Sequence, residues 1–308
     1  MGKTAKKKII LAGKRGFCSG VKNALFLVEK VLAEAAEEDT EKRICVLHEI
    51  VHNDAIVNSL RKKGIIFIDE PEEAVNASTL IFSAHGVSPD VEKRSEKVCK
   101  NIVDATCPIV KKLHKTAEDF EKRNLSILLL GKRGHRETEG IAGRVEGKVT
   151  ILQDENEVKS FLASLSSEEK KKTPFGCLSQ TTMSAGLVKK MKELLAEKLA
   201  NLEIAADVCY ATKERQDAVK FLAQKCDMVF VAGSEKSSNS RRLVEIVKDC
   251  GKMSFLVPDP EKFVFPDLSK CETVGITSGA SAPEYHVETL VKRLLDTDEF
   301  YLMENTEE

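Results

Sequence analysis

The 308-residue sequence lacks any apolar run close to the ~20 residues that a membrane-spanning helix needs. Its basic start, residues 1–8, is followed by an apolar segment, residues 9–12, far shorter than the ~7–15 residues of a signal-peptide core. These two absences predict a soluble protein of the cytoplasm. The sequence also lacks a basic excess, with 48 Lys and Arg against 49 Asp and Glu. A general nucleic-acid binder is therefore not expected, although local anion sites stay open.

Several familiar cofactor motifs are missing as well. No Gly-x-Gly-x-x-Gly sequence occurs, and the Gly-Lys-Thr at residues 2–4 lacks the upstream glycine of a P-loop, which disfavours nucleotide cofactors. No Cys-x-x-Cys pair occurs either, which excludes the common zinc-ribbon and thioredoxin patterns. The nine cysteines are therefore expected to be buried apolar side chains, metal ligands or catalytic thiols rather than disulfides.

What the sequence does contain is a regular alternation of short apolar runs and helical segments. Runs rich in Val, Ile, Leu and Phe recur along nearly the whole chain, and the segments between them carry apolar residues at helical spacing. This alternation is typical of an α/β fold with mostly parallel sheets. The expected strands are residues 8–12, 43–47, 65–68, 80–83, 101–104, 126–130, 149–152, 175–178, 228–232, 254–257 and 273–277.

Three cysteines share one local setting. Cys18, Cys107 and Cys209 each close an apolar run and open an amphipathic helical segment, at separations of 89 and 102 residues. This spacing suggests three pseudo-equivalent α/β lobes, each about one small domain long. The N-terminal strand is free to pack with the third lobe. The expected lobes are residues 1–107, 108–208 and 209–308.

The position of these cysteines suits metal binding, because a helix N-terminus lowers a thiol pKa and favours the thiolate. Three thiolates suit either a zinc site or an iron-sulfur cluster with one iron left open, and the spacing alone does not separate the two. For any single cysteine a buried apolar role is the simpler interpretation, but the threefold recurrence favours a metal centre. The other cysteines are interpreted as structural: Cys45, Cys99, Cys177, Cys226, Cys250 and Cys271.

Polar loops follow the predicted strands, at the sheet edge where α/β proteins bind ligands. His52, His85 and His135 lie in three of these loops, and small polar residues fill two others, at 237–239 and 278–281. Hydroxyls, amides and helix N-termini bind phosphate groups. These loops together therefore predict a phosphate site.

A structural role stays open for some of these polar residues. Residues 281–284 have the sequence of a helix capping box with proline in the first turn. Asn239 or Ser240 could cap the helix that follows. Capping and phosphate binding are compatible, so neither interpretation excludes the other.

His-Glu-Ile-Val-His at residues 48–52 matches the HExxH pattern of zinc proteases. That pattern binds zinc when both histidines share one face of a continuous helix. Here it directly follows the predicted strand 43–47, and Asn53 or Asp54 is expected to cap a helix that runs to Gly64. A zinc-dependent hydrolase is therefore kept only as an alternative.

Two glutamates, Glu137 and Glu139, share a Gly-containing segment with His135. A carboxylate there could shuttle protons, whereas a glutamate in an exposed loop is most often a solvated charge. Thr181 and its neighbour Gln180 carry the same ambiguity. The residues alone leave open which acid faces a site.

Nine motifs follow one another along the chain: GFCSGV (16–21), HEIVHN (48–53), SAHGVS (83–88), DATCP (104–108), GHRETEG (134–140), SQTTMS (179–184), CYATKERQ (209–216), GSEKSSNS (233–240) and GASAP (279–283). In this order they resemble the 4-hydroxy-3-methylbut-2-enyl diphosphate reductase family, also called IspH or LytB. The resemblance covers nearly the whole chain. Nine motifs in order are far more specific than any one of them.

The resemblance implies a three-lobed α/β fold around a 4Fe-4S cluster and the last step of the non-mevalonate (MEP) isoprenoid pathway. The substrate, an allylic diphosphate bound through its hydroxyl at the open iron, takes up two electrons and protons and loses water. The products are isopentenyl and dimethylallyl diphosphates. By motif matching, the residues implied to hold the cluster are Cys18, Cys107 and Cys209, and the implied proton donor is Glu137. The residues implied to bind substrate are His52, His85, His135, Thr181, Ser237, Ser238, Asn239 and Ser281.

One position departs from the family pattern, since Arg136 stands where we expect proline in many relatives. A cation beside the proposed acid is expected to change either the pKa of Glu137, which a neighbouring cation tends to lower, or the shape of the loop. The family also implies an external electron donor such as flavodoxin or ferredoxin, and neither a nucleic-acid nor a membrane partner. A non-enzymatic iron-sulfur sensor stays a second alternative beside the zinc hydrolase.

Overall fold

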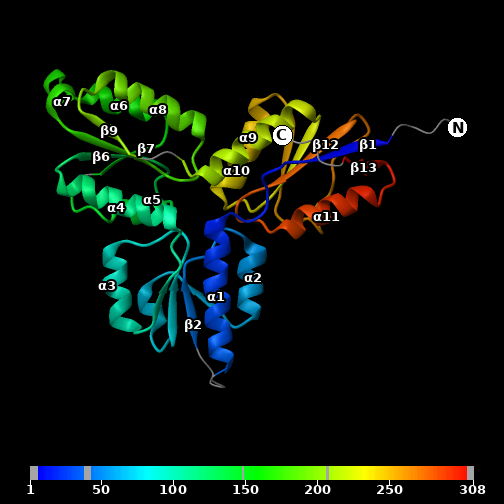
Figure 1. Ribbon diagram of the computed structural model, residues 1–308, viewed down its shortest axis with the longest axis horizontal. Helices are drawn as coiled ribbons and strands as arrows, with labels where there is room; N and C mark the ends of the chain where they lie inside the picture. The colour runs from blue at the N-terminus through cyan, green and yellow to red at the C-terminus, as the bar shows by residue number, and fades with distance from the viewer. Residues whose placement is uncertain (1–5, 38–42, 148, 206–207, 304–308) are drawn as a thin grey trace. The chain divides into compact units, whose positions relative to one another are not determined.

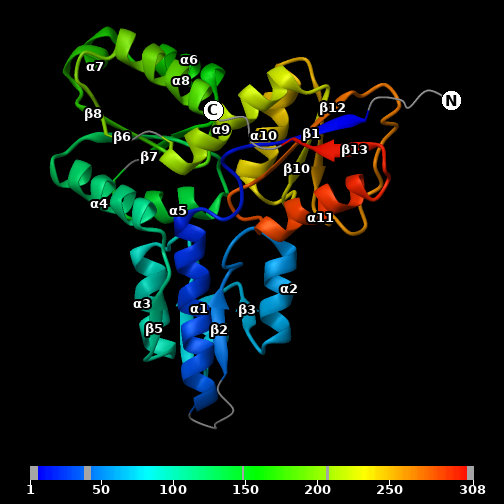
Figure 2. The same ribbon diagram turned by 45° about the vertical axis from the view of Figure 1, so that its right-hand side comes forward.

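The described residues form three β-sheets whose strand pairs are all parallel, with helices on the sheet faces (Figures 1 and 2). The computed structural model describes residues 6–37, 43–147, 149–205 and 208–303. The expected α/β fold with parallel sheets is therefore confirmed. Parts of the Lys-rich start and of the acidic tail lie outside the described residues. No helix in the described ranges is long and apolar enough to cross a membrane.

Contacts divide the chain into two compact units. The first unit comprises Met1–Cys18, His52–Ala55 and Tyr210–Glu308, and the second comprises Ser19–Val51 and Ile56–Cys209. The first unit contains one sheet and the second contains two. The three lobe boundaries expected from the cysteine spacing stay a prediction.

The second unit carries two four-stranded sheets. Their strands are β2 (Ile44–Leu47), β3 (Ile66–Ile68), β4 (Thr79–Phe82), β5 (Ile102–Asp104), β6 (Ser126–Leu130), β7 (Val149–Leu152), β8 (Phe175–Ser179) and β9 (Leu202–Ile204). The helices along the same stretch of chain are α1 (Ser19–Glu37), α2 (Asp54–Lys62), η1 (Pro71–Ala74), α3 (Pro89–Val98), α4 (Pro108–Lys122), α5 (Arg136–Ala142), α6 (Glu155–Ser164), α7 (Ser167–Lys172) and α8 (Ala185–Lys198). The sheet orders are β3-β2-β4-β5 and β7-β6-β8-β9, so the two sheets share one topology.

The first unit carries one five-stranded sheet. Its strands are β1 (Lys7–Leu11), β10 (Met228–Ala232), β11 (Met253–Val257), β12 (Thr273–Ser278) and β13 (Phe300–Leu302). Its helices are α9 (Tyr210–Lys225), α10 (Ser238–Asp249) and α11 (Glu284–Leu295). The sheet order is β11-β10-β12-β1-β13, so β1 occupies the place that β5 and β9 take in the other two sheets. The N-terminal strand therefore completes the sheet of the C-terminal segment.

Each sheet is covered by helices on both faces, which explains why its strands are nearly continuous apolar runs. In the first unit, α11 packs on one face through Val287, Leu290 and Leu294, while α9 and α10 cover the other face (Figures 1 and 2). In the second unit, α6 and α8 lie on one face of β6–β9 and α4 lies on the opposite face (Figure 1). This burial leaves the carboxyl ends of the strands as the polar edge of each sheet.

Two of the strands were not predicted from the sequence. β9 and β13 have three residues each, and two of the three are exposed in each strand. This leaves an apolar pattern too short to recognise. Both strands lie at a sheet edge. The other eleven strands match the predicted ranges to within one residue at each end.

Candidate functional site

The three cysteines singled out by their spacing all stand at helix starts. Cys18 directly precedes α1, Cys107 is the N-cap of α4, and Cys209 directly precedes α9. All three are half-buried, whereas the other six are buried except for the exposed Cys250. The side chain of Cys107 makes no capping hydrogen bond to its helix. These thiols are therefore distinguished from the structural cysteines by both position and exposure.

The backbone around these cysteines repeats one hydrogen bond three times. In each case the cysteine N-H donates to a carbonyl oxygen two residues past the end of a central strand, β12, β4 or β8. The three bonds are Cys18 N to Ala280 O (3.1 Å), Cys107 N to Ala84 O (3.0 Å) and Cys209 N to Thr181 O (3.0 Å). The accepting loops also carry Ser281, His85 and Thr181. Each cysteine is thus tied to a loop with a predicted substrate residue.

The HExxH segment does not form a zinc-protease helix. His48 adopts a left-handed backbone conformation with φ of 62°, and α2 begins only at Asp54, after His52. The two histidines therefore do not share a helix face, as expected. In the part of the chain that the structure describes, no group of three His, Cys, Asp or Glu side chains is placed to hold a metal ion. The assignment of the three cysteines as ligands stays a prediction.

His85 and His135 come together within the second unit. Their ring centroids are 5.9 Å apart in an edge-to-face arrangement. His135 is the N-cap of α5, where its Nδ1 accepts the N-H of Glu137 at 3.2 Å. A neutral His135 consequently carries its proton on Nε2, which makes Nε2 a hydrogen-bond donor. Ser83 Oγ lies 3.3 Å from Nδ1 of His85 and orients that ring.

Glu137 is the buried acid of this region. Its side chain is 2% exposed, and its two carboxylate oxygens accept from Thr181, Oε1 from the N-H at 2.6 Å and Oε2 from the hydroxyl at 2.8 Å. Burial raises the pKa of Glu137 to about 7, although the two hydrogen bonds from Thr181 act in the opposite direction. A carboxyl group with this pKa can hold a proton near neutral pH and release it. Glu139, in contrast, lies at the surface.

The expected lowering of the Glu137 pKa by Arg136 is wrong. The Arg136 guanidinium is directed to the carboxylate of Glu139, with an N to O distance of 3.4 Å. The pKa of Glu137 is raised by burial rather than lowered by a neighbouring cation. Arg136 therefore serves a surface ion pair, and the departure from the family pattern leaves the acid intact.

Gln180 connects the elements that hold Glu137 in place. Its side chain is 1% exposed, and Oε1 accepts the Lys132 N-H at 2.9 Å and the Thr138 hydroxyl at 3.4 Å. Its Nε2 donates to the hydroxyl of Thr182 at 2.9 Å. Thr138 belongs to α5 and Thr182 to the loop after β8. The sequence left the role of Gln180 open and gave no signal for Thr138, because the hydrogen bonds that Gln180 Oε1 accepts come from residues more than 40 positions away.

The Ser237–Asn239 segment forms the start of α10 in the first unit. Ser237, and neither Asn239 nor Ser240, caps this helix by accepting the Ser240 N-H at 3.2 Å, so the expected caps are wrong. Asn239 is only 3% exposed, and in the described structure neither its Nδ2 nor its Oδ1 has a hydrogen-bond partner. Ser238 is also buried. A buried amide without partners at a helix N-terminus points to a ligand that supplies them.

Ser281 joins its own loop to the segment around His52, also within the first unit. Its hydroxyl donates to the carbonyl oxygen of His52 at 3.1 Å, and its carbonyl oxygen accepts from Asn53 Nδ2 at 2.9 Å. The expected capping box is wrong, because α11 has Pro283 at its N-cap and no side-chain cap. The structure thus brings the His52 and Ser281 segments together. Asn53, which the sequence offered only as a helix cap, carries this link.

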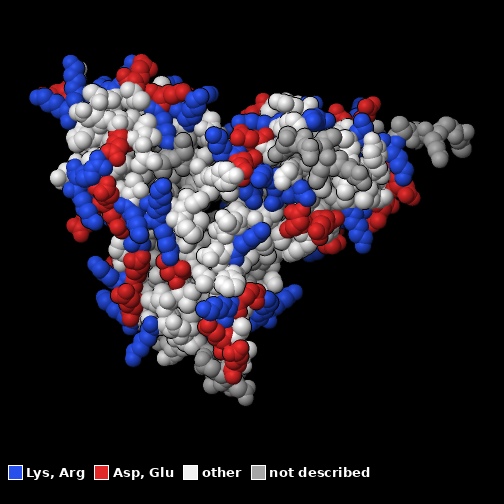
Figure 3. Space-filling model, viewed as in Figure 1, with Lys and Arg blue, Asp and Glu red and all other residues white. Residues whose placement is uncertain are grey.

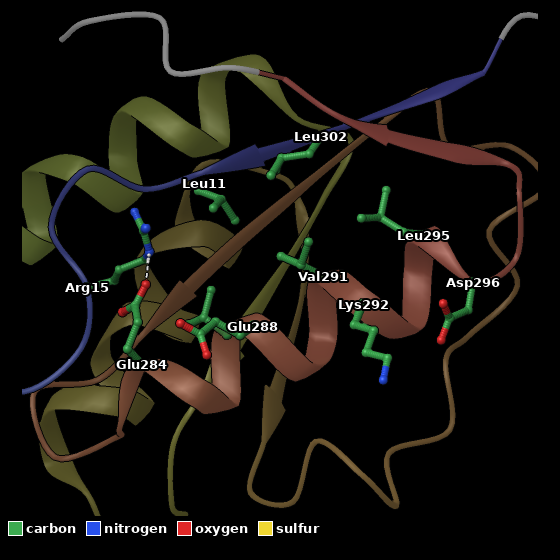
Figure 4. Close-up of a pocket in the computed structure, with 10 residues that line it drawn as sticks. Leu11, Arg15, Glu284, Glu288, Val291, Lys292, Leu295, Asp296 and Leu302 are labelled. Atoms are coloured by element: carbon green, nitrogen blue, oxygen red, sulfur yellow. Dashed lines mark hydrogen bonds and ion pairs between the residues drawn. The ribbon is translucent and has the colours of Figure 1, made fainter.

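A separate cavity of about 350 Å³ in the first unit is not part of this site (Figure 4). It lies beside α11 and the strands β1 and β13, and Arg15 pairs with Glu284 at one end with an N to O distance of 2.7 Å. None of its lining residues is a predicted site residue. Three carboxylates against two cations line it, which disfavours a diphosphate.

On the face drawn in Figure 3, charged side chains of both signs are interspersed.

Comparison with known proteins shows similarity along nearly the whole chain. Residues 9–295 match the family described as LytB protein. The chain is 38% identical over 295 residues to the 4-hydroxy-3-methylbut-2-enyl diphosphate reductase of Acinetobacter baumannii, covering 94% of this chain and 90% of that one. It is 37% identical to the enzyme of the same name from Desulfotalea psychrophila, covering 98% and 93%. The solved E-1-hydroxy-2-methyl-but-2-enyl-4-diphosphate reductase of Plasmodium falciparum superposes with a TM-score of 0.89 at 29% identity, covering 99% of this chain and 94% of that one.

Proposed function

The chain belongs to the LytB protein family, and from this membership we infer that it reduces 4-hydroxy-3-methylbut-2-enyl diphosphate. The reaction removes the allylic hydroxyl as water and gives isopentenyl and dimethylallyl diphosphates, the last step of the non-mevalonate pathway. The observation that carries this conclusion is the match over residues 9–295, which contains all nine motifs. Neither the zinc hydrolase nor the iron-sulfur sensor is supported.

Family membership implies an iron-sulfur cofactor, and we propose a 4Fe-4S cluster held by Cys18, Cys107 and Cys209. Thiolates are the soft ligands that such clusters take, and these three are the half-buried thiols at helix starts. The chemistry of these three thiol side chains therefore fits the group. When bound, the cluster would supply electrons and an iron that acts as a Lewis acid toward the substrate oxygen.

The diphosphate end of the substrate is proposed to bind side-chain hydrogen-bond donors and a helix N-terminus. His135 offers Nε2-H, and Asn239 offers a buried amide at the start of a helix. Both are well suited to an anion, since neutral donors and a helix N-terminus bind phosphate without requiring an overall basic protein. The complete proposed set is His52, His85, His135, Thr181, Ser237, Ser238, Asn239 and Ser281.

Glu137 is proposed to deliver the proton that turns the leaving hydroxyl into water. Hydroxide is a poor leaving group, so an acid is required whose carboxyl is still protonated near neutral pH. Burial of Glu137 meets this requirement, because its pKa is raised to about 7. Thr181 holds the carboxyl in one orientation through both of its oxygens. Glu139 is exposed at the surface and is the weaker candidate.

The electron donor is proposed to be a small external redox protein such as flavodoxin or ferredoxin. This assignment follows only from the family. The substrate is a small molecule.

The test is anaerobic reconstitution followed by a turnover assay with 4-hydroxy-3-methylbut-2-enyl diphosphate and a chemical reductant. We expect a brown protein that forms both isomeric diphosphates. Replacing Cys18, Cys107 or Cys209 by serine should remove iron, sulfide and activity, while Cys45→Ser and Cys271→Ser should behave as the wild-type protein. Full cluster occupancy and turnover in any of the first three variants would overturn the ligand assignment.

A further inference from the structure

His114 is a buried histidine that the proposed mechanism does not use. It lies on α4, two turns after Cys107, and is 4% exposed. Its ring lies against two glycines that are far apart in the sequence, Gly86 and Gly140. Both glycines and His114 belong to the second unit, so the contact is internal to it.

The two glycines leave room for the His114 ring and for little else. A Cβ atom at Gly86 would lie 2.7 Å from Cε1 of His114, and Gly86 also has a left-handed φ of +74°. A Cβ atom at Gly140 would lie 3.3 Å from Nε2 of His114 and 3.5 Å from the carbonyl oxygen of Gly86. The ring is therefore packed against the backbones of two segments that also approach each other closely.

These two segments carry groups of the proposed site. Gly86 directly follows His85 in the loop after β4. Gly140 lies on α5, the helix that begins after His135 and contains Glu137. The two segments come from different sheets of the second unit, so the separation of His85 from His135 and Glu137 depends on how the sheets meet.

A second contact holds the same two segments together. The Arg144 guanidinium, just past the end of α5, donates to the carbonyl oxygen of Val87 at 2.7 Å. It also forms ion pairs with Glu92 on α3 and with Glu118 on α4. Arg144 thus fixes the edge of this junction, while the His114 ring fills its interior.

The state of His114 argues against a role in proton transfer. Burial, followed by the charge of Arg144, lowers the pKa of His114 to about 4; Lys111 acts in the same direction and Asp104 opposes it. The ring is therefore neutral near pH 7. Its Nε2 has no hydrogen-bond partner in the described structure, which costs free energy that an apolar side chain would not cost. Stability alone consequently does not explain a histidine here.

We propose that His114 is a positioning residue of the reductase site, whose ring sets the separation between the His85 loop and the helix that carries His135 and Glu137. The proposal rests on the proposed function for its effect on turnover. Its effect on the environment of Glu137 is independent of that function, because a shift of α5 would let water reach the buried carboxyl.

The direct test is His114→Ala, measured in two ways. Carbon-13 NMR of protein labelled in glutamate follows the titration of Glu137, identified as the signal missing from Glu137→Gln. Hydration should move its midpoint down by about one pH unit, toward an ordinary carboxyl. Turnover should fall roughly ten- to hundredfold at unchanged iron and sulfide content, mostly in kcat. An unmoved midpoint together with an unchanged kcat would overturn the proposal.

A second variant tests the same contact without emptying the core. Gly140→Ala adds a methyl group that presses on the His114 ring, and it should also shift the Glu137 midpoint and reduce kcat. Combining it with His114→Ala gives the methyl group space, so the double variant should recover part of the loss from either single change. Strictly additive effects in this cycle would contradict the contact, whether or not His114→Ala is well folded.

Phe120→Leu is the matched control. Phe120 lies on the same helix, is 1% exposed and packs against Gly176 of β8. It should lower thermal stability and leave the Glu137 midpoint unchanged. An equal midpoint shift in Phe120→Leu would show that any loss of packing has this effect. If wild-type protein shows no turnover while the His114→Ala midpoint still shifts, the proposed function fails and the positioning role stands.

Discussion

The proposed acid, Glu137, and the proposed anion-binding amide, Asn239, differ in how many hydrogen bonds they receive from the protein. Glu137, in the second unit, accepts two short hydrogen bonds from Thr181 and is shielded from water. Asn239, in the first unit, is equally buried but has no partner for either amide atom in the described structure. One group is held before any ligand arrives. The other has an amide donor and an amide acceptor that no protein group satisfies in the described structure.

This difference illustrates two functional uses of a buried polar group. A buried carboxyl needs fixed donors to keep one orientation, and desolvation then tunes its pKa. A buried amide without partners makes the ligand-free protein less stable, but each hydrogen bond to a ligand then relieves a desolvated group. The acid is therefore preorganised by the protein, whereas the anion site is expected to gain its hydrogen bonds on binding.

The largest expected effect comes from removing the preorganised acid. Glu137→Gln should lower turnover by ~10²–10⁴-fold, the usual contribution of a general acid, with cluster content and product affinity retained. The matched control is Glu139→Gln, which removes an exposed carboxylate of the same helix. Steady-state kinetics together with the visible spectrum decide the outcome. If only the Glu139 variant loses turnover with its cluster intact, the acid has been misassigned.

The next effect tests the group without partners. Asn239→Ala should weaken the binding of isopentenyl diphosphate roughly ten- to hundredfold, because a hydrogen bond to a charged ligand is lost. Calorimetry on cluster-loaded protein measures this affinity. His85→Ala should weaken binding to a similar degree. Unchanged affinity in both variants would remove the diphosphate assignment.

A smaller effect tests the donors that hold the acid. Thr181→Val removes the hydroxyl donor to Oε2 and keeps the N-H donor to Oε1. Because hydrogen bonds to a carboxylate lower its pKa, their loss should raise the pKa of Glu137 above its value of about 7. Turnover depends on the protonated acid, so its decline with rising pH should move about one unit higher. Thr181→Ser, which keeps the hydroxyl, should retain the wild-type profile.

The smallest effect compares two asparagines in the ligand-free protein. Asn101 donates through Nδ2 to the Thr79 hydroxyl at 2.8 Å, so Asn101→Ala should lower the free energy of unfolding by about 1 kcal/mol. The Asn239 amide has no hydrogen bond to another side chain or to the backbone in the described structure. Asn239→Ala should therefore lower the free energy of unfolding by less than Asn101→Ala does, or even raise it. Urea denaturation of both variants checks this difference. An equal loss in the two would show that Asn239 is already satisfied within the chain.

Much of the fold was readable from the sequence because the sheets are buried on both faces. Strands such as β6 and β10 are uninterrupted apolar runs, and helices with one apolar stripe separate them, so period and length identify both. β9 and β13 were missed, and each is a short edge strand with two of its three residues exposed. The helix starts at Cys18, Cys107 and Cys209 were predicted, since each cysteine opens an amphipathic helical segment.

The details of the site were less predictable, because they depend on which side chain a group meets. Ser281 was expected to cap α11, but its hydroxyl is bonded to the His52 carbonyl oxygen. Arg136 was expected to act on Glu137, but it is directed to Glu139. His114 does not follow a strand, so the strand-end pattern gave no signal for it. Its place on the apolar stripe of α4, beside Leu113 and Ala117, was the only local signal that it is buried.

By itself, the sequence determined the class of fold, the positions of the three cysteines at helix starts and the family, because these depend on local periodicity and on motifs in order. Only the tertiary structure decided that Glu137 rather than Glu139 is the buried acid and that Thr181 is its partner. The two glutamates are two residues apart and chemically identical. Their difference in pKa arises from burial and from donors more than 40 residues away, which no local pattern records.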